Sequence, residues 1–141
     1  MVNLKKIFFA LILLFLSFSF KANSEVVNKV NIIGSERVSL ETIVVFGDIK
    51  IGDNYESSDI NLLIKKLYET TFFSNISVEL QDGQLNIAVK ENPIINTVEL
   101  EGEKAKKYTE AIKEKLILRE KTSYLENYIK SDINLLKTFY R

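Results

Sequence analysis

The chain carries one short pattern twice. Residues 26–34 read VVNKVNIIG, and residues 94–102, which begin 68 positions later, read IINTVELEG. The copies share an asparagine, a valine and a glycine: Asn28 and Asn96, Val30 and Val98, Gly34 and Gly102. In the first copy the valines and isoleucines alternate with polar residues, as in a strand with one buried face. A repeat at this distance indicates an array of small similar units, each opening on a strand.

The residues after the first copy predict two helices. Ser39 is a candidate N-cap for a short helix, and Gly47 is a candidate residue to end it. Ser57 or Ser58 would cap the second helix. Its apolar residues recur at helical spacing and form one stripe: Ile60, Leu63, Ile64, Leu67 and Tyr68.

A hairpin is expected next, because the apolar period changes from about 3.6 to two. Asp82-Gly83 separates two alternating runs, which is a strong signal for a type I′ turn. A two-residue turn there pairs Gln81 with Gln84 and, further along, Ile76 with Val89. The one proline, Pro93, then ends the unit.

The second copy repeats this plan up to its second helix. One helix is expected near residues 104–118, and the next opens with a capping box of Ser123 and Glu126. The fold class is therefore α+β, with tandem β-α-α-β-β units in which a three-stranded mixed sheet packs on two helices. The expected division is a signal peptide at residues 1–24, a first unit at 25–92, and a second at 93–141 that lacks its last two strands.

The signal-peptide prediction rests on the first residues. Lys5 and Lys6 precede a stretch without charge at residues 7–20, and Ala22 and Ser24 occupy the −3 and −1 positions of a cleavage site before Glu25. A retained membrane anchor is the alternative. Fourteen apolar residues span only about 21 Å as a helix, less than the roughly 30 Å of a hydrocarbon core, which favours cleavage.

Composition and charge exclude several functional classes. The chain has no cysteine and no histidine, so disulfides, thiolate nucleophiles, imidazole bases and the usual zinc ligands are absent. Residues 25–141 carry 16 basic and 19 acidic side chains, which argues against nucleic acid as a partner. A cluster of four acids could suggest a cation or acid-base site: Asp48, Asp53, Glu56 and Asp59. Acids are also favoured at a helix N-terminus, so no catalytic, metal or cofactor site is predicted there.

Two motifs in this order resemble a known family. LYxxxFF at residues 67–73 leads into the hairpin, and VKENP at residues 89–93 opens the next copy. Behind an export signal, this arrangement is similar to the POTRA domains of outer-membrane protein assembly factors of the BamA type. The resemblance covers residues 26–141. The family usually has a glycine before the aromatic pair, whereas this chain has Thr71, which leaves the geometry of that turn open.

The resemblance implies a scaffold, not an enzyme, at the periplasmic face of a Gram-negative outer membrane. Its implied partners are unfolded outer-membrane proteins, periplasmic chaperones and other subunits of an assembly complex, with the membrane reached through a C-terminal β-barrel absent from this sequence. Such partners are expected to add as a strand along one edge, at Asn75, Ile76, Ser77, Val78, Glu79 and Leu80. An edge strand offers unpaired N–H and C=O groups to any extended chain.

Three alternatives share parts of this pattern. A cell-division protein of the FtsQ type also carries a POTRA domain but would keep its apolar segment as an anchor, so a mature protein beginning at Glu25 would separate the two. A transporter of a related barrel branch fits the same motifs. A KH-like RNA-binding domain shares the β-α-α-β order, but no GxxG loop joins the helices here.

Overall fold

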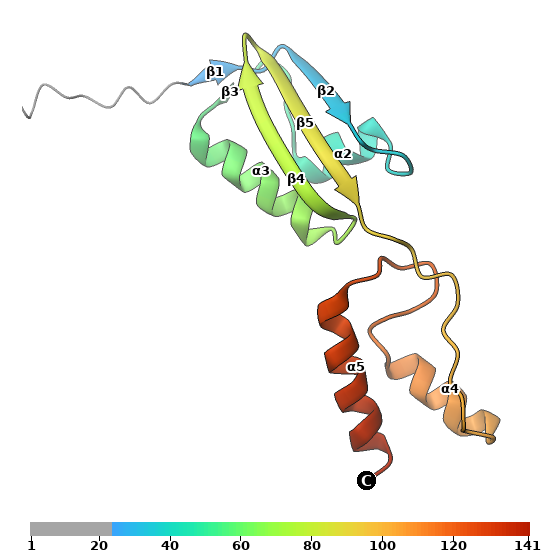
Figure 1. Cartoon of the computed structure of the whole chain (residues 1–141). Helices are drawn as coiled ribbons and strands as arrows, with labels where there is room; N and C mark the ends of the chain where they lie inside the picture. Colours follow the sequence, from blue (N-terminus) through green and yellow to red (C-terminus); the bar gives the residue numbers. More distant parts are fainter. Residues whose placement is uncertain (1–23) are drawn as a thin grey trace, which may run out of the picture.

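The computed structural model describes residues 24–141, so the predicted signal peptide, apart from Ser24, lies outside the described residues. Seven elements form an N-terminal unit: β1 (Glu25–Val26), β2 (Lys29–Ile33), α2 (Leu40–Gly47), β3 (Asn54–Tyr55), α3 (Ser57–Glu69), β4 (Phe73–Gln81) and β5 (Gln84–Glu91). Two helices follow, α4 (Lys106–Lys115) and α5 (Glu126–Phe139) (Figure 1). Among residues 24–141, no helix is both long enough and apolar enough to cross a membrane.

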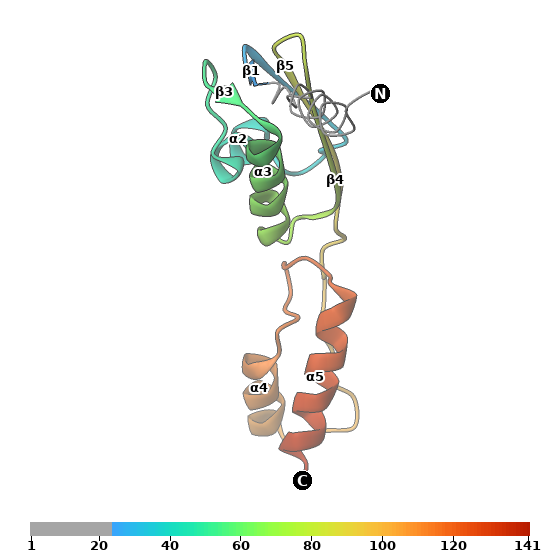
Figure 2. The same ribbon diagram turned by 90° about the vertical axis from the view of Figure 1, so that its left-hand side faces the viewer.

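The main sheet has three strands in the order β2-β5-β4. β5 pairs in parallel with β2 and antiparallel with β4, so the predicted mixed sheet is confirmed. Figure 2 shows α2 and α3 on the same face of this sheet. A second, two-stranded pairing of β1 with β3 was not anticipated. β5 is therefore the central strand, and β4 lies at one edge.

The core lies between this face of the sheet and the two helices. Leu85 and Ile87 of the central strand are fully buried, and Leu63 and Leu67 of α3 pack in the same cluster with Ile43 of α2. The inward-facing residues of β5 therefore pack with the apolar stripe of α3, as the strand period of two and the helical period of 3.6 predict. Burial of these side chains supplies the main stabilisation of a unit this small.

The hairpin agrees with the sequence prediction in register and turn type. Gln81 lies opposite Gln84 and Ile76 opposite Val89. Asp82 and Gly83 both have positive φ, at 52° and 73°, as a type I′ turn requires. A β-bulge between Phe73 and Asn75 interrupts β4 near its start and was not predicted.

Helix capping differs in part from expectation. Ser39 caps α2 as predicted, since its side chain accepts a hydrogen bond from the Thr42 amide. Gly47 is the last residue of α2 and not the residue that follows it; Asp48 takes the left-handed conformation, at φ 51°. Gly47 is still needed, because a Cβ there would lie 2.5 Å from Leu63 Cδ1 on α3.

The α3 cap lies one residue before the predicted serines. Glu56 is the N-cap, and Asp59 Oδ2 accepts a hydrogen bond from its amide at 2.9 Å. Ser57 and Ser58 are the first residues of the helix. A carboxylate in the first turn also interacts favourably with the helix dipole, so the acid pair replaces the serine cap.

The turn that leaves α3 keeps a left-handed residue although it has no glycine. Thr71 has φ 62°. A side chain branched at Cβ is strained in this conformation. Asn92, which is buried, holds the turn in place: its Nδ2 donates to Thr71 O at 2.8 Å and its amide donates to Phe72 O at 2.8 Å. The surrounding structure therefore imposes the conformation on Thr71.

Replacing Thr71 with glycine should stabilise the N-terminal unit by about 1 kcal/mol, since the relief of strain exceeds the added chain entropy of glycine. Urea unfolding measures the change. Thr70→Gly is the control: Thr70 has φ −68° and its Oγ1 donates to Leu67 O at 2.6 Å, so this change should destabilise the unit. A Thr71→Gly variant as unstable as Thr70→Gly would show that the turn is unstrained.

The second copy of the repeat does not form the expected strand at residues 94–102. Only Ile94 bridges to another segment, at Ser123, and Ile95 exchanges backbone hydrogen bonds with Thr122 and Lys121. In the N-terminal unit β2 pairs with β5, whereas no hairpin follows α5 within residues 24–141, so the second copy has no such partner. Gly34 and Gly102 nevertheless share a left-handed conformation, at φ 84° and 89°.

The predicted capping box of Ser123 and Glu126 is wrong. Ser123 forms the bridge with Ile94, and α5 begins three residues later with no side-chain cap. α4 contacts α5, and Ile112 of α4 and Leu116, the residue after this helix, are buried. Asp132 on α5 is also buried, and its two carboxylate oxygens accept the amides of Ile117 and Leu118, each at 2.9 Å. These bonds fix the chain where it leaves α4.

Candidate functional site: the free edge of β4

The residues predicted to bind partners, Asn75 to Leu80, all lie in β4, the edge strand of the sheet. Their side chains alternate between the core and solvent. Ile76 is buried and Val78 and Leu80 are half-buried, whereas Asn75, Ser77 and Glu79 are exposed. The strand therefore presents a backbone edge whose inward side chains are already anchored in the fold.

One hydrogen bond shows which way the backbone groups of β4 point. The Ile76 amide donates to the hydroxyl of Tyr68 on α3, at 3.1 Å, and so points away from β5. In an antiparallel pair the amides of alternate residues point to the same side. By this alternation, the amides of Val78 and Leu80 also point to the free edge.

A groove runs beside this edge, between β4 and the start of α3. Its volume is about 380 Å³, and Val78, Leu80 and Ile60 supply its apolar part. Glu25, Tyr55 and Glu56 contribute polar groups to its lining. A strand added to β4 would direct alternate side chains toward this groove, since side chains of a strand alternate between its two faces.

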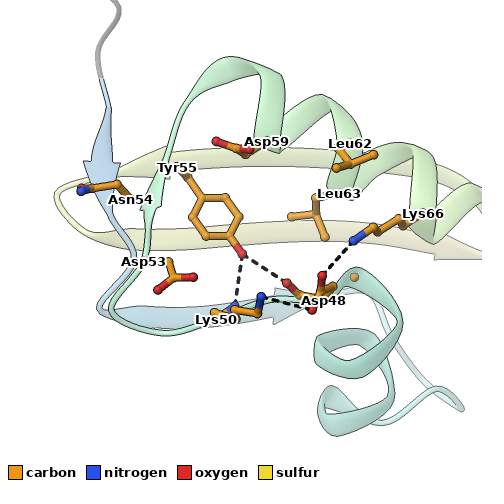
Figure 3. A pocket seen from close by; sticks show the side chains of 10 residues that line it. Asp48, Lys50, Asp53, Asn54, Tyr55, Asp59, Leu62, Leu63 and Lys66 are labelled. Atoms are coloured by element: carbon orange, nitrogen blue, oxygen red, sulfur yellow. Dashed lines mark hydrogen bonds and ion pairs between the residues drawn. The ribbon is translucent and has the colours of Figure 1, made fainter.

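Three of the four acids, Asp48, Asp53 and Asp59, line one pocket (Figure 3), and Glu56, the N-cap of α3, is not part of its lining. Asp48 pairs with Lys66 at 3.0 Å and Lys50 at 3.9 Å. The hydrogen bond from Lys66, followed by the charges of Lys50 and Lys66, lowers the pKa of Asp48. Asp59 caps α3, as described above. Within the described residues, no group of three or more acidic side chains is placed to hold a metal ion.

Tyr55 also lines the pocket that contains Asp48, and the volume of this pocket is about 170 Å³. Its hydroxyl accepts the Lys50 amide at 3.1 Å. Asp48 thus pairs with two lysines and Tyr55 bonds to the backbone, and these contacts fasten the loop between α2 and α3. The arrangement is that of a loop anchor.

Glu91, at the end of β5, is an anchor that sequence reasoning missed. Its Oε1 accepts the amides of Glu36, Arg37 and Val38 at 2.9, 2.9 and 3.0 Å, and its Oε2 lies 2.8 Å from Arg37 Nε. Burial by itself would raise the pKa of Glu91. The hydrogen bonds from the Val38, Arg37 and Glu36 amides and the charge of Arg37 outweigh burial and lower the pKa from 4.5 to about 2.

Glu91 and Asn92 give two residues of the VKENP motif a structural role. Glu91 ties the end of β5 to the loop between β2 and α2, and Asn92 ties it to the turn after α3. Arg37 joins both, since its guanidinium also donates to Asn92 O at 2.6 Å. The sequence gives no sign of these contacts other than the motif itself, because the partners lie more than 50 residues from Glu91.

Solved structures share this fold. The N-terminal domain of Omp85 from Thermosynechococcus elongatus matches with a TM-score of 0.58 and 14% identity, over 84% of this chain and 52% of that one. POTRA1-2 of the periplasmic domain of Omp85 from Anabaena matches with a TM-score of 0.56 and 19% identity, over 85% and 80%. The fold is therefore that of POTRA domains.

Two curated relatives carry the same name. The outer membrane protein assembly factor BamA of Neorickettsia risticii is 32% identical over 130 residues, and that of Neisseria meningitidis serogroup B is 33% identical over 78 residues. No protein-family model matches the chain. The matches span 92% and 55% of this chain but only 17% and 10% of the relatives. The chain is thus similar in sequence to BamA proteins and in fold to POTRA domains of Omp85.

Proposed function

We propose that this chain supplies the periplasmic POTRA part of an outer-membrane protein assembly factor, and that extended segments of client proteins add as a strand to the edge of β4. The edge of β4 beside its groove is the observation that carries the proposal. Both relatives are named outer membrane protein assembly factors, which favours a role in assembly over a role in cell division or transport. The partners are then unfolded outer-membrane proteins, the chaperones that deliver them and other subunits of the assembly complex.

The proposed domain plan follows the same reasoning. Residues 1–24 are an export signal, residues 25–92 are a first POTRA domain, and residues 93–141 contribute the helices of a second. The match to a two-domain POTRA structure over 85% of this chain supports this division. Export places the β4 edge in the periplasm, where unfolded outer-membrane proteins pass.

Strand addition suits clients of many sequences. The affinity comes from main-chain hydrogen bonds, and the side chains contribute only where a pocket meets them. Strands of outer-membrane barrels alternate apolar and polar residues. Such a strand laid along β4 would place one set of side chains over Val78, Leu80 and Ile60 and the other set in water.

A backbone ester at Val78 tests the proposal. It removes the amide donor at the free edge and leaves the side chain unchanged. Binding of a fluorescent Val/Thr heptapeptide, measured by anisotropy, should weaken about fivefold, while stability changes little. The matched ester at Ser77 removes a donor that the register places toward β5, and it should instead lower stability by about 1 kcal/mol. Unchanged binding by the Val78 ester would rule out addition at this strand.

A further inference from the structure

The Tyr68 hydroxyl occupies the first backbone donor of the free edge. Tyr68 lies in the last turns of α3, and its side chain reaches the Ile76 amide across the start of β4. It is 42% exposed, so core packing does not lock the ring in place. A carbonyl of an incoming strand that is to pair with this amide must first displace the hydroxyl.

The β-bulge interrupts the edge at the same end of β4, close to its first residue. Pairing with β5 is irregular between Phe73 and Asn75, and Ser74 Oγ donates instead to Lys90 O at 3.1 Å. Bulges commonly end pairing at sheet edges by twisting the strand. At the other end β4 stops at Gln81, before the turn. The regular part of the edge therefore extends only from Asn75 to Gln81.

We infer that Tyr68 is a stop for strand addition: an incoming strand pairs with β4 from Val78 toward Gln81, and the phenol excludes it from the Ile76 amide. This inference rests on the proposed function. Exchanging the phenol for a peptide carbonyl replaces one hydrogen bond with another of similar strength, so a longer client gains no binding energy at Ile76 and still loses the conformational entropy of its added residues. The stop thus sets how much of a client is held.

Tyr68→Phe tests the stop, because it keeps the ring and removes only the acceptor. The probes are two alternating Val/Thr peptides, one of five residues and one of nine. We expect the nonapeptide to bind the variant about fivefold more tightly than the parent, since one further hydrogen bond becomes available. The pentapeptide should bind both proteins alike.

Amide hydrogen exchange provides the local readout. In the parent, bound nonapeptide should protect the Val78 and Leu80 amides and leave Ile76 unchanged; in Tyr68→Phe it should protect Ile76 as well. Leu85 and Ile87, which are fully buried, report whether the fold is intact. Tyr140→Phe is the matched control, because the Tyr140 hydroxyl bonds to Glu103 Oε2, away from β4, and its loss should not change binding.

The outcomes separate the two proposals. If both proteins bind both peptides but the nonapeptide shows no preference for Tyr68→Phe, strand addition stands and the stop is refuted. Protection of Ile76 by the nonapeptide in the parent also refutes the stop. If neither protein binds either peptide, the proposed function itself fails and the inference fails with it.

Discussion

Replacing Glu91 with glutamine should lower the free energy of unfolding by about 3 kcal/mol at neutral pH. The side chain is 8% exposed, and its charge is held by three backbone amides and Arg37. The pKa of about 2 in the folded protein lies below the ordinary 4.5, and this difference corresponds to roughly 3 kcal/mol of linked stability. Glutamine keeps the shape of the side chain but removes the charge.

The sign of this pKa shift also predicts a pH dependence. Because folding lowers the pKa of Glu91, its contribution is fully present above about pH 4.5 and is lost as the pH falls toward 2. Urea unfolding at a series of pH values should show that the parent loses more stability over this range than Glu91→Gln does. Asp48→Asn is the control, because Asp48 pairs with lysines at an exposed site and its loss should have little effect. Equal losses in the parent and Glu91→Gln would contradict the role assigned to Glu91.

Gly34→Ala should unfold the N-terminal unit or destabilise it by more than about 3 kcal/mol. The added Cβ would collide with the carbonyl oxygen of Val89 in the central strand, and the residue already has φ 84°. Relieving the clash requires β2 to move away from β5, which removes the parallel pairing. Far-UV circular dichroism and amide exchange at Leu85 and Ile87 would report the loss.

The repeat supplies the matched control. Gly102 has nearly the same backbone conformation, at φ 89°, but among residues 24–141 no atom other than those of its chain neighbours lies within 4 Å of an added Cβ. Gly102→Ala should therefore cost only the backbone strain, about 1 kcal/mol, and should leave Leu85 and Ile87 protected. Similar effects at the two glycines would mean that the contact with Val89 is not what requires Gly34.

The hairpin was predictable because all the information for it is local. Asp82-Gly83 requires one turn type, and the alternation on either side of it then determines every pair up to Ile76 and Val89. The choice of β4 as the binding edge, by contrast, came from the resemblance to POTRA domains and not from the alternation. The six residues from Asn75 to Leu80 remain a predicted binding site, and the experiments above are its test.

Features that depend on distant partners were not predictable in the same way. Residues 94–102 match β2 in pattern, but a strand forms only where another strand pairs with it. The Glu91 anchor and the bond between Tyr68 and Ile76 each join different elements, so no spacing in the sequence reveals them. Identical strings also mislead: DINLL occurs at Asp59 and Asp132, yet Asp59 caps its own helix and Asp132 holds the end of a neighbouring one.

The positions where the chain begins and leaves the N-terminal unit have a mechanical consequence. Glu25, at its start, accepts a hydrogen bond from the Gly83 amide at the turn of the hairpin, whereas Asn92, just after β5, lies at the other end of that strand. Eight residues of strand span about 27 Å. The chain therefore enters at one pole and leaves at the opposite one, as Figure 1 shows. We therefore expect any segment joined after Asn92 to be held about one strand length, roughly 27 Å, from Glu25, so that the N-terminal unit acts as a spacer.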